Sequence, residues 1–162
     1  MVARYRADLS YRPSPLNLGK ARYVGVFVER LKPGYRREYE ESVKLDVAAY
    51  AKAGITNERW IAYQVSAGVT GGMYIYFAPM ASLAEWDVDN EKAYAEAMGE
   101  SGRSRQTEIT RQALSTTEFH MFAVSPKMSY VSKELAAVDP DFWKPKPATG
   151  KVPAVKTDKP KP

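Results

Sequence analysis

Apolar and polar side chains along the chain follow two different periods. Four segments alternate with the period of two that is typical of β-strands. These segments are Tyr23–Leu31, Trp60–Val65, Met73–Phe77 and Glu118–Val124. The second and third are separated by the Gly-rich sequence GVTGG, which predicts a hairpin between them.

Helical periodicity occupies the sequence between these strand segments. Apolar side chains recur at i, i+4 spacing over residues 35–51, and Gly54 follows at the position where a glycine ends many helices. Residues 82–89 begin with a capping serine and predict a short helix. Residues 91–116 predict a further helical region that is interrupted near Gly99.

The order of the predicted elements is strand, helix, strand, strand, helix, strand. This order predicts an α+β, ferredoxin-like βαββαβ fold with a four-stranded antiparallel sheet and both helices on one face. The predicted strands are apolar on both faces, although the helices cover only one of them. We therefore expect the bare face to meet the same face of a second copy, which gives a homodimer with a shared α/β barrel.

Three regions are expected along the 162 residues. Residues 1–20 are polar and predict an extended N-terminal arm. Residues 21–143 form the α/β-barrel domain, and residues 144–162 form a Lys/Pro-rich tail that is expected to be disordered. The end of the domain is expected to dock on its body through Tyr130, Phe142 and Trp143.

The net charge of +5 is concentrated in the ends of the chain. Residues 144–162 hold six Lys and one Asp, so the rest of the chain holds equal numbers of basic and acidic side chains. A nucleic-acid-binding domain needs a basic face on its folded body, so nucleic acid is not expected as a partner. No apolar run is long enough for membrane insertion, and no signal peptide is recognised at the N-terminus. A cytoplasmic location is expected, or export if a signal has been removed.

The strand YVGVFVERL, the Lys32-Pro33-Gly34 turn after it and Tyr39 on the following helix carry a resemblance to a known family. Together with the last strand EFHMFAV, they make the chain similar to the dimeric α/β-barrel superfamily, over about residues 23–124. That superfamily includes antibiotic-biosynthesis-monooxygenase-like and NIPSNAP-like domains. The resemblance implies a fold more than an activity, because cofactor-free monooxygenases, haem degraders and haem peroxidases all belong to it.

His120 is the only histidine of the chain and lies in the last predicted strand. It is the candidate catalytic residue, either as an acid/base or as a haem ligand. A histidine satisfied locally in the sheet is the other interpretation, and the one we favour. One histidine and no cysteine do not make a usual multi-residue metal site, so no metal is expected. No cofactor is expected either, except haem if His120 is its ligand.

Aromatic side chains on the strands and the short helix are the candidate ligand-binding residues. They can orient an aromatic ligand, or they can pack at the dimer interface, where Tyr and Trp are enriched. This set is Trp60, Tyr63, Tyr74, Tyr76 and Trp86.

Glu29 and Arg30 are charged residues at the end of an otherwise apolar strand, and they point to opposite faces. One of them can enter a cleft, although charges at strand ends are usually solvated.

Three functional hypotheses follow from these patterns. The first is a small-molecule-binding dimer that acts as a cofactor-independent monooxygenase on an aromatic substrate, with His120 as the base. The second is a non-enzymatic structural or interaction module whose barrel is packed. The third is a haem-binding protein that uses His120 as its axial ligand.

Overall fold

The computed structural model describes residues 1–15, 17–69 and 71–144. The predicted tail lies outside the described residues beyond Lys144. No helix in these described ranges has both the length and the apolar composition needed to cross a membrane.

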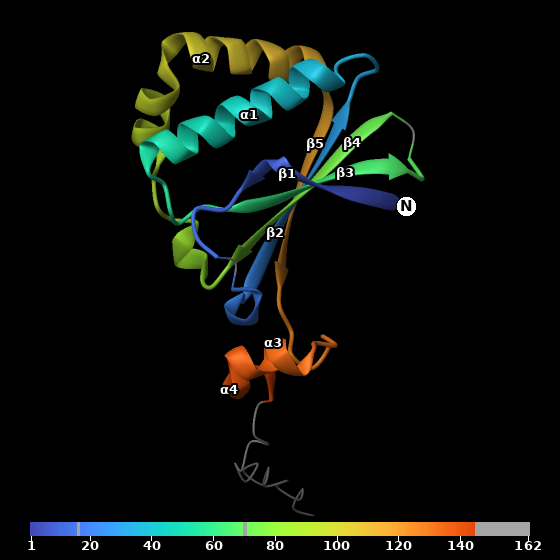
Figure 1. Cartoon of the computed structure of the whole chain (residues 1–162), viewed down its shortest axis with the longest axis vertical. Coiled ribbons are helices and arrows are strands. Elements are labelled where there is room, and N and C mark those ends of the chain that lie inside the picture. The colour runs from blue at the N-terminus through green and yellow to red at the C-terminus, as the bar shows by residue number, and fades with distance from the viewer. Residues whose placement is uncertain (16, 70, 145–162) are drawn as a thin grey trace, which may run out of the picture.

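One antiparallel sheet organises the structure, with strands in the order β1-β3-β4-β2-β5 (Figure 1). Its strands are β1 (Val2–Tyr11), β2 (Tyr23–Leu31), β3 (Trp60–Ala67), β4 (Gly72–Met80) and β5 (Leu114–Ala123). From β2 to β5 the predicted order of strands and helices is confirmed, because one helix follows β2 and another follows β4. The predicted number of four strands is wrong, since β1 adds a fifth.

Two long helices pack side by side on one face of the sheet (Figure 1). They are α1 (Arg36–Ala53) and α2 (Glu91–Ala113). Gly54 ends α1 with a φ of 66°, and Gly99 interrupts α2 with a φ of 73°, both of which glycine adopts without steric cost. Shorter helical segments are η1 (Leu18–Lys20), η2 (Leu83–Glu85), α3 (Lys133–Val138) and α4 (Pro140–Trp143).

Strand β1 was expected to be part of an extended arm, but it pairs with β3 at the edge of the sheet. Its Arg6 is buried against α1, where the guanidinium contacts Glu40 at 2.5 Å and Asp8 at 2.8 Å. The pairing breaks its register after Arg6, and the Ser10 hydroxyl accepts a hydrogen bond from the Ala62 N–H at 2.9 Å. Both the sheet and α1 therefore hold β1 in place.

The main hydrophobic core lies between the sheet and the two long helices. Tyr74 of β4 is fully buried there, and its ring packs against Tyr39 of α1 with centroids 4.8 Å apart. The other buried members of this core are Leu9, Leu31, Val43, Ala62, Tyr76, Ile109 and Ala113. The core holds the N-terminal half of α1 and the C-terminal end of α2 on the sheet.

The opposite face of the sheet, called here the open face, is not covered by any helix of the described residues (Figure 1). Strand alternation places apolar side chains on it, including Val65, Met73 and Ile75, which cluster with Val26 and Val28. Phe77 and Phe122 lie on the same face and are exposed.

The C-terminal segment docks near the start of β2. The Trp143 indole is buried and donates a hydrogen bond to the Gly19 carbonyl at 2.8 Å. Arg22 forms an ion pair with Asp139, and its guanidinium lies 3.6 Å from the centroid of the Phe142 ring. Tyr130 is fully exposed and takes no part in this docking.

Replacing Arg6 by Ala is expected to destabilise the protein by about 3 kcal/mol, because Glu40 and Asp8 would lose their buried counter-charge. Arg4→Ala is the matched control, since Arg4 is exposed on the same strand, and it is expected to change stability by less than about 0.5 kcal/mol. Urea unfolding followed by circular dichroism measures both changes. Equal effects of the two substitutions would show that β1 is not held by the Arg6 cluster.

Candidate functional site

A pocket of about 730 Å³ opens between the helix-covered face of the sheet and the two long helices. Its floor is formed by β2, β4 and the first residue of β3, and its walls by α1 and α2. The loops at residues 57–59 and 85–90 complete its rim. The pocket is therefore built from segments that are far apart in the sequence, and it lies at the C-terminal half of α1.

Aromatic rings form two sides of this pocket. On one side, the Tyr50 ring packs edge-on against Trp60 at 5.0 Å and in a tilted arrangement against Tyr94 at 5.2 Å between centroids. On the other side, Trp86 stacks 6.4 Å from Phe27, and it is 51% exposed. The pocket thus offers the flat apolar surfaces that bind aromatic or apolar ligands.

Glu29 of β2 is a carboxyl of the pocket that contacts Tyr39 of α1. The Tyr39 hydroxyl donates a hydrogen bond to the Glu29 carboxylate and also shares a hydrogen bond with the Tyr76 hydroxyl. Burial raises the pKa of Glu29 above its ordinary value, and the negative charge of Asp46 raises it further, against the hydrogen bond from Tyr39. Glu29 is therefore a carboxyl that holds its proton more firmly than a solvated one.

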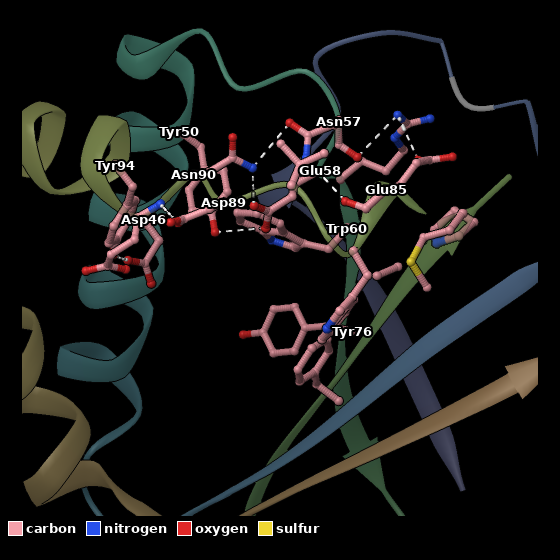
Figure 2. A pocket seen from close by; sticks show the side chains of 18 of the residues that line it. Asp46, Tyr50, Asn57, Glu58, Trp60, Tyr76, Glu85, Asp89, Asn90 and Tyr94 are labelled. Carbon is pink, nitrogen blue, oxygen red and sulfur yellow. Dashed lines mark hydrogen bonds and ion pairs between the residues drawn. The ribbon is translucent and has the colours of Figure 1, made fainter. Parts of the chain in front are cut away.

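Asp46 of α1 is a second, half-buried carboxyl in the wall. It accepts hydrogen bonds from the Tyr94 hydroxyl at 2.6 Å and from the Gln106 amide at 3.1 Å (Figure 2). Burial raises the pKa of Asp46, and these two donors oppose that rise. The donors fix the carboxylate at the end of the pocket formed by α1 and α2.

Glu58 connects the α1–β3 loop to α1 and to the loop that precedes α2. It accepts a hydrogen bond from the Tyr50 hydroxyl at 3.0 Å and another from the Asn90 amide at 2.7 Å (Figure 2). The Asn90 amide also donates to the Asn57 side chain at 3.2 Å. These bonds tie the two rim loops to each other and keep the mouth of the pocket in one shape.

The structure brings together three of the five predicted ligand-binding aromatics. Trp60, Tyr76 and Trp86 line the pocket. Tyr74 lies outside it, buried beneath α1, where its hydroxyl donates to Glu40 at 2.5 Å. Tyr63 lies on the open face, with its ring edge-on to Phe77 at 5.7 Å.

His120 lies on the open face of β5 and is not among the residues that line the pocket. Its side chain is 51% exposed, and its Nε2 lies 3.5 Å from Glu118 Oε2. The neighbouring residue Phe119 points to the other face, where it packs against Phe27 and Trp86. The structure therefore does not bring His120 together with Trp60 and Tyr76.

Glu29 and Asp46 carry the chemistry of the pocket, and sequence reasoning gave them little or no weight. Glu29 was considered as a strand-end charge, with entry into a cleft as the less favoured alternative to solvation. Alternation gives the signal that was available, because Glu29 shares the helix-covered face of β2 with Phe27 and Leu31. Asp46 likewise lies on the apolar stripe of α1, three residues after Val43. A carboxyl on an otherwise apolar face of a strand or helix was therefore a better indicator of the pocket than His120, which was chosen because it is the only histidine.

The pocket does not fit a haem ligated by histidine, because its lining offers carboxylates, phenols and indoles but no imidazole. Within the described parts of the chain, no group of three or more His, Cys, Asp or Glu side chains is arranged to hold a metal ion.

Comparisons with protein family models, with curated proteins and with solved structures find no match to this chain.

Replacing Glu29 by Gln is expected to change how stability depends on pH. The folded state raises the pKa of Glu29 above the ordinary 4.5, so stability from this group is present below pH 4.5 and is lost as pH rises through the folded pKa. The glutamine does not ionise, so the variant should gain stability relative to the wild type as pH rises.

Urea unfolding at intervals from about pH 4 to about pH 8 measures this difference. Glu96→Gln, at an exposed position of α2, is the control and should run parallel to the wild type. A Glu29→Gln curve that also runs parallel would mean that burial does not shift the ionisation of Glu29.

Proposed function

We propose that this chain is a small-molecule-binding protein of the ferredoxin-like, dimeric α/β-barrel type, and that the pocket under α1 and α2 is its ligand site. The observation that carries the proposal is a pocket of about 730 Å³ in which aromatic walls surround half-buried carboxyls. Ligand sites typically have volumes of roughly 300–1,000 Å³ and a few polar groups among apolar walls. The second hypothesis concerns a packed barrel on the open face of the sheet, whereas this pocket lies on the helix-covered face.

The enzymatic form of this proposal is a cofactor-independent monooxygenase acting on an aromatic substrate. In that chemistry the protein removes a proton from the substrate and excludes water, while the substrate supplies electrons to oxygen. Glu29 takes the role of base that His120 had in the sequence-based hypothesis, because Glu29 lines the pocket and His120 does not. The hydrogen bonds from Tyr76 through Tyr39 give the proton a path to Glu29.

A neutral aromatic probe, 2-naphthol, is expected to bind the wild-type protein and to quench its tryptophan fluorescence, because Trp60 and Trp86 line the pocket. Ala78→Leu adds a larger side chain at the floor of the pocket and should weaken binding by about tenfold or more. Ala48→Leu, on the exposed side of α1, is the matched control and should leave the affinity unchanged.

Binding of 2-naphthol that Ala78→Leu leaves unaltered would place the ligand elsewhere and refute the proposed site. Oxygen consumption during incubation with hydroxynaphthalenes tests the enzymatic form separately. A rate that falls about 100-fold or more in Glu29→Gln supports Glu29 as the base. No oxygen consumption by the wild type with bound probe would leave a binding protein rather than a monooxygenase.

The homodimer is part of the proposal, with the open face as the contact between two copies. The exposed apolar residues Phe77 and Phe122 support it, because side chains of this size on one uncovered sheet face are typical of interaction surfaces. A two-fold axis brings the same patch of both copies together and buries it in a shared barrel.

Phe77→Glu is expected to convert the dimer to a monomer, since two carboxylates would be buried against each other at the two-fold contact. Thr107→Glu, on the exposed side of α2, is the control and should stay dimeric. Sedimentation equilibrium measures both masses. A wild-type protein that is monomeric at all accessible concentrations would refute this contact.

A further inference from the structure

The carboxylates of the pocket have hydrogen-bond donors but no counter-charge from the protein. Glu29, Asp46 and Glu58 accept hydrogen bonds only from hydroxyls and amides. None of the ion pairs among the described residues includes any of the three. Buried carboxylates are ordinarily paired with a cation, since the loss of hydration is costly. The pocket therefore presents negative charge that the protein itself does not neutralise.

The same protein pairs other carboxylates with a buried arginine. Glu40 and Asp8 lie on either side of the Arg6 guanidinium, which contacts both. Hydrogen bonds from Arg6 lower the pKa of both carboxyls, whereas burial raises the pKa of Glu29 and Asp46. Glu40 and Asp46 both lie on α1, but Glu40 contacts Arg6 of β1, whereas Asp46 contacts Tyr94 and Gln106 of α2. The missing cation is therefore particular to the pocket.

The whole lining of the pocket carries the same imbalance. Seven of the lining residues are acidic, and Arg59 is the only basic one. The Arg59 guanidinium lies 3.5 Å from the Glu85 carboxylate at the rim, so its charge is already paired there. An anionic ligand would meet repulsion on entering, whereas a cationic ligand would be attracted.

The aromatic walls favour an organic cation over a metal ion. Tyr50, Trp60 and Tyr94 lie against each other beside Asp46 and Glu58, and the faces of such rings attract ammonium groups. Divalent metal ions need several oxygen ligands that converge on one point. The described residues form no group of three or more His, Cys, Asp or Glu side chains that could hold such an ion. Aromatic faces together with single carboxylates are suited to a protonated amine attached to an apolar body.

We propose that the ligand of this pocket is an organic cation, an aromatic or apolar molecule that carries a protonated amine, and that Asp46 and Glu58 pair with its charge. This assignment rests on the proposed function, because it names the chemical class of the ligand for the same site. The amine lies between these carboxylates and the rings of Tyr50 and Trp60, and the apolar body extends toward Phe27.

Three probes that share one ring system test the assignment: 2-naphthylmethylamine, 2-naphthalenemethanol and 2-naphthoate. Isothermal titration calorimetry at neutral pH should give an affinity for the amine about tenfold or more above that for the alcohol. The naphthoate should bind most weakly. Asp46→Asn and Glu58→Gln should each reduce the affinity for the amine at least about fivefold and leave that for the alcohol unchanged. Glu96→Gln, which removes a carboxylate outside the pocket, should change neither affinity.

The outcomes separate this inference from the proposed function. An alcohol that binds as tightly as the amine, with binding sensitive to Ala78→Leu, overturns the cation assignment and leaves the small-molecule site in place. A loss of amine affinity in Glu96→Gln equal to that in Glu58→Gln would trace the preference to overall charge and overturn the assignment as well. Absence of binding by all three probes would refute the site itself. If Asp46→Asn does not fold, the affinity of Glu58→Gln for the amine tests the assignment alone. Glu58 is half-buried at the rim, so its substitution is expected to leave folding intact.

Discussion

The seating of α1 on the sheet through its second turn determines most of the architecture. Tyr39 and Glu40 are neighbours on the helix, and both make polar contacts with the strands below. Tyr39 bonds to Glu29 and Tyr76, while Glu40 is held by Arg6 and Tyr74. These contacts fix the N-terminal half of α1 at a set height above β2, β4 and β1. The C-terminal half of the same helix then overhangs the sheet, and the pocket occupies the space beneath it.

Holding a helix on a sheet through polar and charged side chains gives less stability than apolar packing can give. This loss of stability indicates that the polar groups serve a function. Apolar side chains of similar volume often stabilise a core as well as or better than buried charged groups. Glu29 and Asp46 both have a raised pKa because burial disfavours their ionised forms, so each lowers stability near neutral pH. Their positions are explained by ligand chemistry in the pocket better than by packing, since strained or costly groups tend to gather at functional sites.

The sequence predicted most elements because their periods are local properties of the chain. The two long helices, the hairpin and the order of the four central strands follow from apolar spacing and from glycines such as Gly54. Strand β1 was missed because Arg4 and Arg6 alternate with Ala3 and Tyr5 in a segment that looked polar. Arg6 is buried by a partner on α1, and the sequence around Arg6 does not indicate that burial.

The candidate site was harder to predict, because it depends on which face of each strand the helices cover. His120 and Phe119 were known to point to opposite faces, but alternation alone does not say which face is which. The structure gives Phe119 to the helix-covered face, beside Phe27 and Trp86. That one assignment removes His120 from the pocket and, through the strand register, puts Glu29 on the pocket side.

The charge state of the pocket then links its two proposed roles. In the empty pocket, burial raises the pKa of Glu29 and Asp46, because no cation offsets the loss of their hydration. A bound ammonium group stabilises their ionised forms, so ligand binding and proton release are coupled at this site. An ionised Glu29 is also the form that accepts a proton from a substrate, and Tyr39 and Tyr76 connect it to the ligand space. A cationic ligand would therefore favour the ionised form of the base that acts on it, whereas a neutral aromatic molecule would not.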